Sequence, residues 1–238
     1  MTELADIEAG STDPNDQGSP VTLLTSLDRV KLEYVYLVIA LIWGIALVAV
    51  MPPFGVPDEP AHFARAWGLA QGVILSPRNF EEVLPANVWS LQNDFPPGPI
   101  RDTSHYPAHF GPSVGSLLRE RISPQQIAGV TAVPSQNPAA YAPQALGIEL
   151  VRLARGSPLA AFYFARLVNL LVAIGLIFFA IRLAPVGKVM ILIVALFPGV
   201  ISEMASVSPD ALMIAGAMFF TGLALNYSER SRLSTKSM

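Results

Sequence analysis

The stretch that decides the fold is LEYVYLVIALIWGIALVAVMPPFGVPDEPAHFARAWGLAQG, residues 32–72. Residues 32–50 are apolar apart from Glu33, and about 20 such residues in a helix cross the hydrocarbon core of a bilayer. The two prolines that follow at 52 and 53 stop a helix. The stretch therefore predicts a transmembrane helix that ends just before a polar segment.

The composition of the whole chain agrees with a membrane protein. Of its 238 residues, 52% are hydrophobic and only 14% are charged, with a mean hydropathy of +0.48, whereas soluble domains carry about 25% charged residues. The net charge of −3 and the lack of a basic patch argue against nucleic acid as a partner. The chain has no cysteine, which excludes disulfides and thiolate chemistry.

Three further apolar runs follow in the C-terminal part of the chain, at residues 162–181, 189–204 and 210–226. They predict transmembrane helices 2 to 4 within residues 162–227. An alternative is that the third and fourth runs form a re-entrant hairpin, because the third is short and contains Pro198. The fold class predicted is an all-α integral membrane protein with about four spans.

The long loop between the first two spans, residues 51–161, holds 16 of the 21 prolines and all three histidines. Two amphipathic surface helices are predicted in it. The first runs from Glu59 to Gln71, with Pro60 in its first turn and Gly72 as its stop. The second covers residues 141–156. The segment between them is expected to be mostly irregular.

The distribution of basic residues predicts the orientation. Lysine and arginine flank the apolar runs in residues 1–31, in the turn between spans 2 and 3, and in residues 228–238. By the positive-inside rule, all three segments are expected in the cytoplasm, the first as a disordered tail, and the long loop is expected outside the cell membrane.

Asp58, Glu59, His62 and Arg65 form the densest cluster of ionisable residues. Helical spacing places Asp58 and His62 on one face, with Arg65 a turn further on, so the four are expected to point together into a pocket above the membrane. A carboxylate there can act as a general base or hold a divalent cation. The alternative is structural: an acidic N-cap with Arg65 as its ion-pair partner.

Other candidate groups carry weaker signals. His105 and His109 are four apart, but Pro107 lies between them, so a zinc pair is disfavoured. Asp94 and Asp102 are either acidic ligands or ordinary loop residues. Arg166, near the outer end of the second span, is either a snorkelling side chain or an anion contact. Glu203 could face the same outer cavity, and Asp210 is typical of helix capping.

The order of motifs resembles an uncharacterised bacterial family of multi-spanning membrane proteins, a domain of unknown function grouped with the GT-C glycosyltransferases. The matching elements are PPFGVPDEPAHFARAWGLAQG, the segment from YAPQALGIEL through AFYFARLVNLLV, and then AIRLAPVGK, ALFPG and ASVSPDAL. They cover the chain from about Leu32 to Asn226. The family's usual His-Pro-Pro element appears here as NPAAY, residues 137–141.

The resemblance implies roles for particular residues. GT-C enzymes carry an acidic general base or metal ligand just past the first span, which corresponds to Asp58, with Glu59 second. A divalent cation, Mg²⁺ or Mn²⁺, is the one cofactor expected. Basic or aromatic side chains usually hold the lipid phosphate, and Arg65, Tyr141 and Arg166 are placed for this, with His62 in support.

The function predicted is therefore transfer of a sugar from a polyprenyl-phosphate donor to a cell-envelope acceptor in the bacterial inner membrane. GT-C enzymes have more spans, so the chain resembles their N-terminal half, and a partner membrane protein could supply the rest. The alternative is a non-catalytic membrane subunit or scaffold that binds a lipid or a partner protein.

Overall fold

Long helices dominate the computed structural model, which describes residues 31–75, 81–95, 112–131 and 137–236. Three of them are long and apolar enough to cross a membrane: α2 (Leu32–Val50), α7 (Pro158–Leu183) and the first 22 residues of α10 (Asp210–Lys236). The prediction of a helical membrane protein is confirmed at this level. The predicted disordered tail, apart from residue 31, lies outside the described residues, as do Asp102, His105 and His109.

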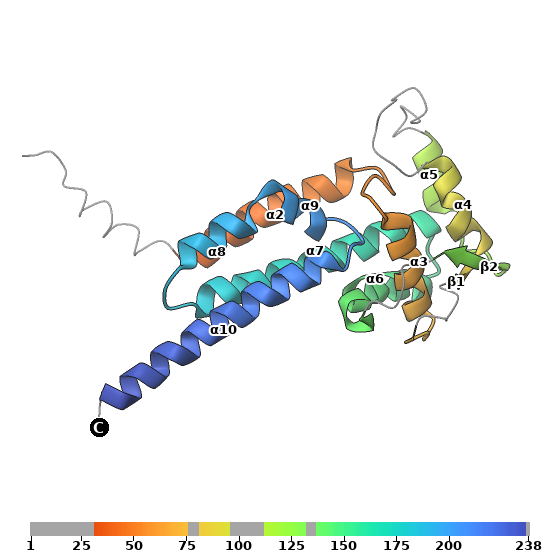
Figure 1. Ribbon diagram of the computed structural model, residues 1–238. Coiled ribbons are helices and arrows are strands. Elements are labelled where there is room, and N and C mark those ends of the chain that lie inside the picture. Colours follow the sequence, from red (N-terminus) through yellow and green to blue (C-terminus); the bar gives the residue numbers. More distant parts are fainter. Residues whose placement is uncertain (1–30, 76–80, 96–111, 132–136, 237–238) are drawn as a thin grey trace, which may run out of the picture. The chain divides into compact units, whose positions relative to one another are not determined.

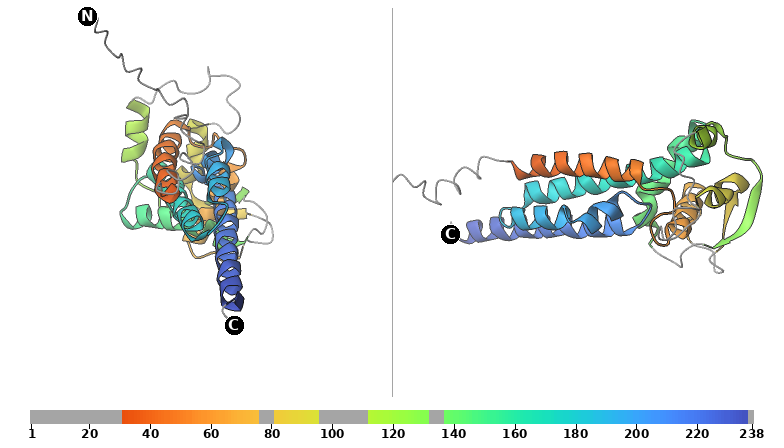
Figure 2. Two further views of the ribbon diagram at one scale, coloured as in Figure 1. Left: turned by 90° about the vertical axis from the view of Figure 1, so that its left-hand side faces the viewer. Right: turned by 90° about the horizontal axis from the view of Figure 1, so that it is seen from above.

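The third apolar run is not one continuous helix. It forms α8 (Lys188–Ala195) and α9 (Pro198–Met204). Proline cannot donate its backbone nitrogen and disfavours helical geometry at the residue before it, so Pro198 interrupts the run. Figures 1 and 2 show α8 and α9 together running back beside α2 and α7 before α10 returns.

The helix ends follow local sequence signals. α7 begins at Pro158, four residues earlier than expected, because the Ser157 hydroxyl accepts the Ala160 N–H at 3.0 Å. The Ser208 hydroxyl likewise accepts the Asp210 N–H at 3.1 Å and starts α10. α10 continues to Lys236, past the expected boundary at Asn226, because no proline or glycine follows Gly222 in that stretch.

The segment between α2 and α7 contains more regular structure than the sequence predicts. Helices α3 (Glu59–Ala70) and α6 (Ala142–Leu153) match the two expected surface helices. The part expected to be irregular also contains α4 (Ala86–Asp94), α5 (Pro112–Arg119), a 3₁₀ turn η1 (Pro138–Tyr141) and two strands. Strands β1 (Glu81–Pro85) and β2 (Gln126–Thr131) pair antiparallel, with a bulge between Glu82 and Leu84.

Two apolar cores lie on either side of the junction where α2 ends. One joins α2, α7, α8, α9 and α10, which we call the bundle, and its buried members include Tyr36, Leu170, Ile174, Ile177 and Met204. The other lies among the helices and strands between α2 and α7, which we call the loop elements, and it includes Phe54, Phe63, Trp67, Ile148 and Phe162. Because α7 contributes to both cores, its N-terminal turns connect the loop elements to the bundle (Figure 1).

At Gly147, α6 approaches the backbone of α7 closely. A β-carbon at this position would overlap the backbone carbonyl of Phe164. We expect Gly147→Ala to lower the thermal unfolding midpoint by several degrees, because overpacking against a backbone costs about 1–3 kcal/mol. Gly175→Ala on α7 is the control, since a β-carbon there meets nothing. Equal midpoints for both variants in the same detergent would contradict the close packing of α6 on α7.

Candidate functional site

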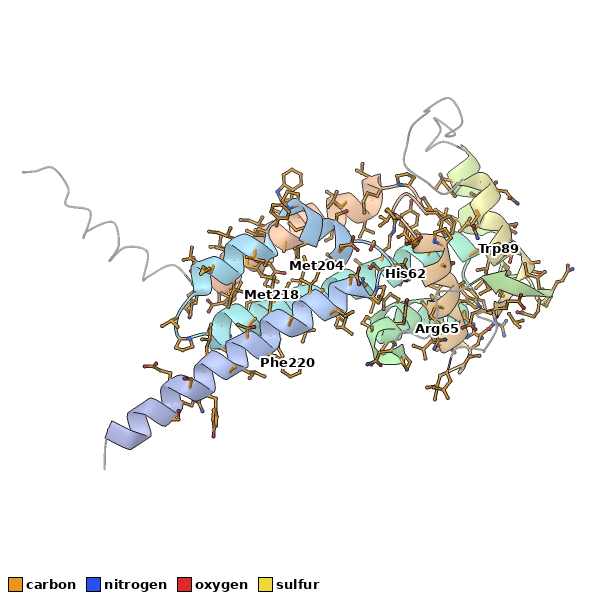
Figure 3. The ribbon with its side chains drawn as sticks, viewed as in Figure 1. His62, Arg65, Trp89, Met204, Met218 and Phe220 are labelled. Carbon is orange, nitrogen blue, oxygen red and sulfur yellow. The ribbon has the colours of Figure 1, made fainter. Side chains whose placement is uncertain are left out.

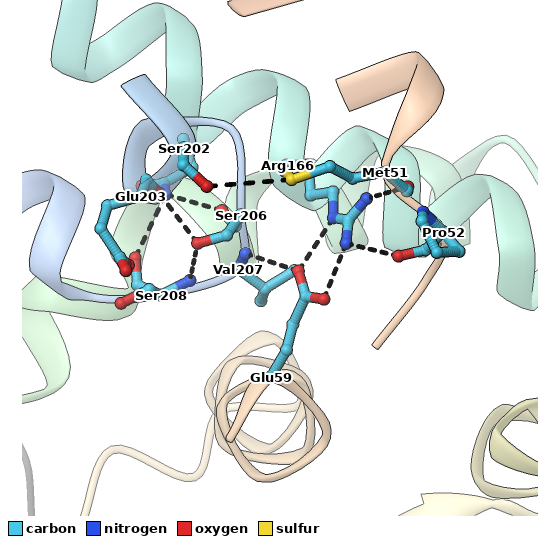
Figure 4. Close-up of polar contacts among 10 residues, drawn as sticks. Met51, Pro52, Glu59, Arg166, Ser202, Glu203, Ser206, Val207 and Ser208 are labelled. Carbon is cyan, nitrogen blue, oxygen red and sulfur yellow. Dashed lines mark hydrogen bonds and ion pairs between the residues drawn. The ribbon is translucent and has the colours of Figure 1, made fainter. Parts of the chain in front are cut away.

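A buried ion pair marks the junction between the bundle and the loop elements. Arg166 on α7 donates from Nε to Glu59 Oε1 at 2.8 Å and from Nη2 to Glu59 Oε2 at 2.7 Å. Both side chains are at most 1% exposed. Figure 4 shows the pair together with the backbone groups that complete it.

Backbone groups from two further segments complete this network. Arg166 also donates to the carbonyl oxygens of Met51 at 2.7 Å and Pro52 at 3.0 Å, just after α2. The backbone N–H of Val207, between α9 and α10, donates to Glu59 Oε1 at 3.1 Å. One ion pair therefore holds the end of α2, the start of α3 and the turn before α10 against α7.

Two buried amides hold the same turn before α10. Asn169 Nδ2 donates to the carbonyls of Ser206 and Ser208 at 2.9 and 3.2 Å, and Gln144 Nε2 donates to Ser208 at 3.0 Å. The turn is thus bonded from α3, α6 and α7. This fixes the position at which Asp210 enters α10.

Arg65 belongs to a second buried ion pair. Its Nη1 donates to Glu82 Oε1 at 3.1 Å and to the Val73 carbonyl at 2.9 Å, and its Nη2 donates to the Ile74 carbonyl. Burial raises the pKa of Glu82, and the neighbouring Arg65 charge opposes that rise. Arg65 therefore ties the end of α3 to β1.

The four clustered residues do not share one pocket, which corrects the expectation from helical spacing. Glu59 faces Arg166, Arg65 faces Glu82, and His62 faces Tyr141. Figure 3 shows His62 and Arg65 at different positions along α3. Asp58 occupies the N-cap position, but its side chain makes no capping hydrogen bond. The alternative is therefore right that an acid occupies the N-cap position, but wrong that Arg65 is its ion-pair partner.

Asp58 is the one exposed member of the cluster. Its backbone has φ 59°, in the left-handed region, which costs a non-glycine residue energy and is often found at functional sites. Its carboxylate makes no hydrogen bond or ion pair with any of the described residues. The conformation at 58 turns the chain so that Glu59 enters the core while the preceding carboxylate stays in solvent.

His62 and Tyr141 form a polar pair beside Asp58. His62 Nδ1 lies 2.8 Å from Tyr141 Oη. Burial lowers the pKa of His62, and the charges of Asp210, Asp58 and Glu59 oppose this effect. Burial also raises the pKa of Tyr141. The histidine is therefore neutral at pH 7, and the phenol keeps its proton.

Asp210 is the residue that sequence reasoning undervalued. It looked like an ordinary first-turn acid, but it lies close enough to His62 and Tyr141 to influence the pKa of both. Its side chain is exposed at the start of α10. The available signal was the SVSPDAL motif, because a proline-containing turn after the third apolar run returns the chain to the level of Asp58.

An apolar groove leads toward this junction from the bundle. It has a volume of about 540 Å³ and lies between α2 and the α8–α9 break; its lining residues are Ile39, Trp43, Leu47, Leu196, Pro198, Ile201 and Ser202. The Ser202 hydroxyl donates to the Met51 sulfur at 3.8 Å, and the Met51 carbonyl binds Arg166. The groove therefore adjoins the ion-pair network (Figure 4).

The surroundings of Asp58 and Glu59 show whether their carboxylates could bind a divalent cation. Both oxygens of Glu59 accept from Arg166, Oε1 also accepts from Val207, and the side chain is only 1% exposed, so Glu59 is poorly placed to bind a metal. Asp58 has a free carboxylate. Within the described ranges, no group of three or more His, Cys, Asp or Glu side chains could hold an ion. The described side chains therefore do not form a metal site by themselves.

Removing one partner of the Glu59–Arg166 pair should be strongly destabilising. We expect Glu59→Gln or Arg166→Gln to cost about 3–5 kcal/mol in free energy of unfolding, because each leaves a buried charge unpaired. The control is Glu149→Gln, which breaks a half-exposed pair with Arg152 and should cost at most about 1 kcal/mol. Similar unfolding midpoints for all three variants would contradict the structural role of the pair.

The protonation of His62 should lower the free energy of unfolding in acid. The pKa of His62 is lowered from 6.5 in the folded chain, so below pH 6.5 the unfolded state binds the proton first and the folded state loses stability. We expect the unfolding midpoint of the wild type to fall more steeply than that of His62→Gln between pH 7.5 and 5. Parallel pH profiles would contradict a lowered pKa.

Comparison with known proteins gives one match. The model of a family described as predicted membrane protein (DUF2142) matches residues 41–238. No curated protein and no solved structure matches the chain. The match covers most of the chain, including α3, α7 and α10, and the chain therefore belongs to this family of predicted membrane proteins.

Proposed function

We propose that the chain is a GT-C-like membrane glycosyltransferase, or part of one, which transfers a sugar from a polyprenyl-phosphate donor to a cell-envelope acceptor. The observation that carries the proposal is the exposed carboxylate of Asp58, held by a left-handed backbone beside the His62–Tyr141 pair. The resemblance of the PDEPAHF segment to GT-C enzymes supplies the reaction class.

The membrane arrangement that supports this proposal has four crossings. In this arrangement α8 and α9, which together run back along α2, form a broken third crossing. The start of α2 and the end of α10 would then be on one side. The juxtamembrane positive residues Arg182 and Lys188 favour the cytoplasm for that side. Asp58 and Asp210 are then on the outer face of a bacterial inner membrane, where lipid-linked sugars serve as donors.

Asp58 would act as the general base. Its carboxylate takes the proton of the acceptor hydroxyl while that oxygen bonds to the anomeric carbon of the donor sugar. The bond from the anomeric carbon to the phosphate oxygen breaks, and the electron pair leaves with the phosphate. Asp210, whose charge also acts on His62, favours the same proton transfer by keeping the local potential negative.

His62 and Tyr141 would orient the substrate. If the phenol donates to Nδ1, the proton of the neutral imidazole is on Nε2, which is then a hydrogen-bond donor for a sugar hydroxyl. Glu59, Arg65 and Arg166 would act indirectly, by positioning. The bonds of Arg166 to Glu59 and of Arg65 to Glu82, and those of both arginines to backbone carbonyls, would have to break before either arginine could touch a lipid phosphate.

The leaving phosphate then needs another source of positive charge. Mg²⁺ often binds through one or two carboxylates together with substrate phosphates, and a free Asp58 suits that shared arrangement better than Glu59 does. Such an ion would stabilise the charge that develops on the phosphate. The apolar groove beside α2 has the chemistry to hold part of the polyprenyl chain.

A second candidate function is a non-catalytic subunit that binds a lipid or a partner membrane protein. Only 17% of the apolar window of α10 is buried, against 50% for α7. An apolar face this open is suited to packing against further helices from a partner. In this alternative, Asp58 and His62 have no chemical role.

A transfer assay separates the two functions. We expect membranes containing the wild type to transfer radiolabelled sugar from a mixed polyprenyl-phosphate donor pool, and Asp58→Asn to lower the rate by at least about 100-fold, a typical contribution of a general base. Asp94→Asn, at another exposed acid, should keep full activity. Transfer by an inserted Asp58→Asn variant at the wild-type rate would rule out Asp58 as the base. Absence of transfer by every variant would favour the subunit.

A further inference from the structure

Three arginines from two separate parts of the chain line one cavity. Arg152 is in the last turn of α6, and Arg155 follows between α6 and α7. Arg121 comes from the connection between α5 and β2. The cavity has a volume of about 410 Å³, and Ile122, Glu149, Leu153 and Gly156 complete its lining.

The lining carries an excess of positive charge. Glu149 is its one acid, and Oε2 of this residue accepts from Arg152 Nη1 at 2.6 Å. Arg152 also donates to the Ala70 carbonyl at 2.8 Å and lies over the Trp67 ring, so the fold holds it in place. Arg121 and Arg155 have exposed side chains that form no hydrogen bond or ion pair within the described part of the chain.

Helix capping does not explain this convergence. A basic residue in the last turn of a helix is favoured by the helix dipole, which accounts for Arg152. Arg155 lies beyond the helix end, with φ 55° in the left-handed region, and Arg121 belongs to a different segment. Two unpaired guanidinium groups at one cavity repel each other unless an anion lies between them.

We propose that this cavity binds an anionic group, a phosphate or a carboxylate, of a molecule outside the bilayer. Guanidinium groups form forked hydrogen bonds with both kinds of anion. The site is separate from the Asp58 junction and shares no residue with it. It does not depend on the glycosyltransferase proposal, although an acidic acceptor would suit both.

The length of α7 places the cavity beyond the hydrocarbon core. α7 has 26 residues and is about 39 Å long, about 9 Å more than the core is thick. With Arg182 at the opposite boundary, the excess is at the N-terminal end, where Gly156 and the cavity precede Pro158. The cavity is therefore at the outer edge of the headgroup layer, where an anion can enter from the aqueous side.

Phosphate binding by the full chain tests the proposal. The line width of inorganic phosphate in phosphorus NMR is followed against protein concentration in a phosphate-free sugar detergent, at constant ionic strength. We expect saturable binding, weakened about tenfold, or 1.4 kcal/mol, by either Arg121→Gln or Arg155→Gln. Arg119→Gln is the matched control, because this exposed arginine on α5 is outside the cavity.

Three outcomes would overturn the proposal. One is the absence of saturable binding by the folded wild type, and another is equal weakening by Arg119→Gln, which would indicate general charge attraction. The third comes from nanodiscs. If phosphate stabilises the chain against heat in phosphatidylcholine but not in phosphatidylglycerol, an anionic headgroup already fills the cavity, and the ligand is a lipid.

Discussion

Arg166 places a guanidinium where water is excluded, and four oxygen atoms from two neighbouring segments surround it. An unpaired charge at this depth would be costly, so the chain must bring these oxygens to α7 whenever it folds. Two are the backbone carbonyls of Met51 and Pro52, which follow directly after the end of α2. The other two belong to Glu59, in the first turn of α3, where the helix dipole favours a negative charge.

The position of the exposed groups follows from this buried pair. Because Glu59 must enter the core, the residue before it takes a left-handed backbone and remains in solvent, which orients Asp58. Because Glu59 also accepts the Val207 N–H, the turn before α10 is fixed, and Asp210 is brought near His62. The buried pair of Glu59 and Arg166 thus brings Asp210 near Asp58 and His62, although about 150 residues separate them in the sequence.

Local patterns were enough to predict some of this arrangement. Hydropathy alone located α2 and α7, and proline and glycine positions marked the ends of α3. The break at Pro198 was visible in the sequence, but its effect on the helix was not. The partners of the charged residues could not be predicted, because Glu59 and Arg166 are separated by 107 residues and helical spacing suggested Arg65 instead. The strands were missed because each has at most six residues.

The surface near Asp58 and the cavity at the end of α6 carry opposite charges, because their arginines are paired to different extents. At the junction, both nearby arginines are neutralised by buried glutamates, so the exposed surface retains the charge of Asp58 and Asp210. At the end of α6, a single half-exposed glutamate faces three arginines, so the cavity remains positive. A molecule with an acidic group and a free hydroxyl would be repelled by the first site and held by the second. Such a molecule would bind with its acidic end at the arginines and its hydroxyl free, which is the orientation that the proposed transfer reaction would use.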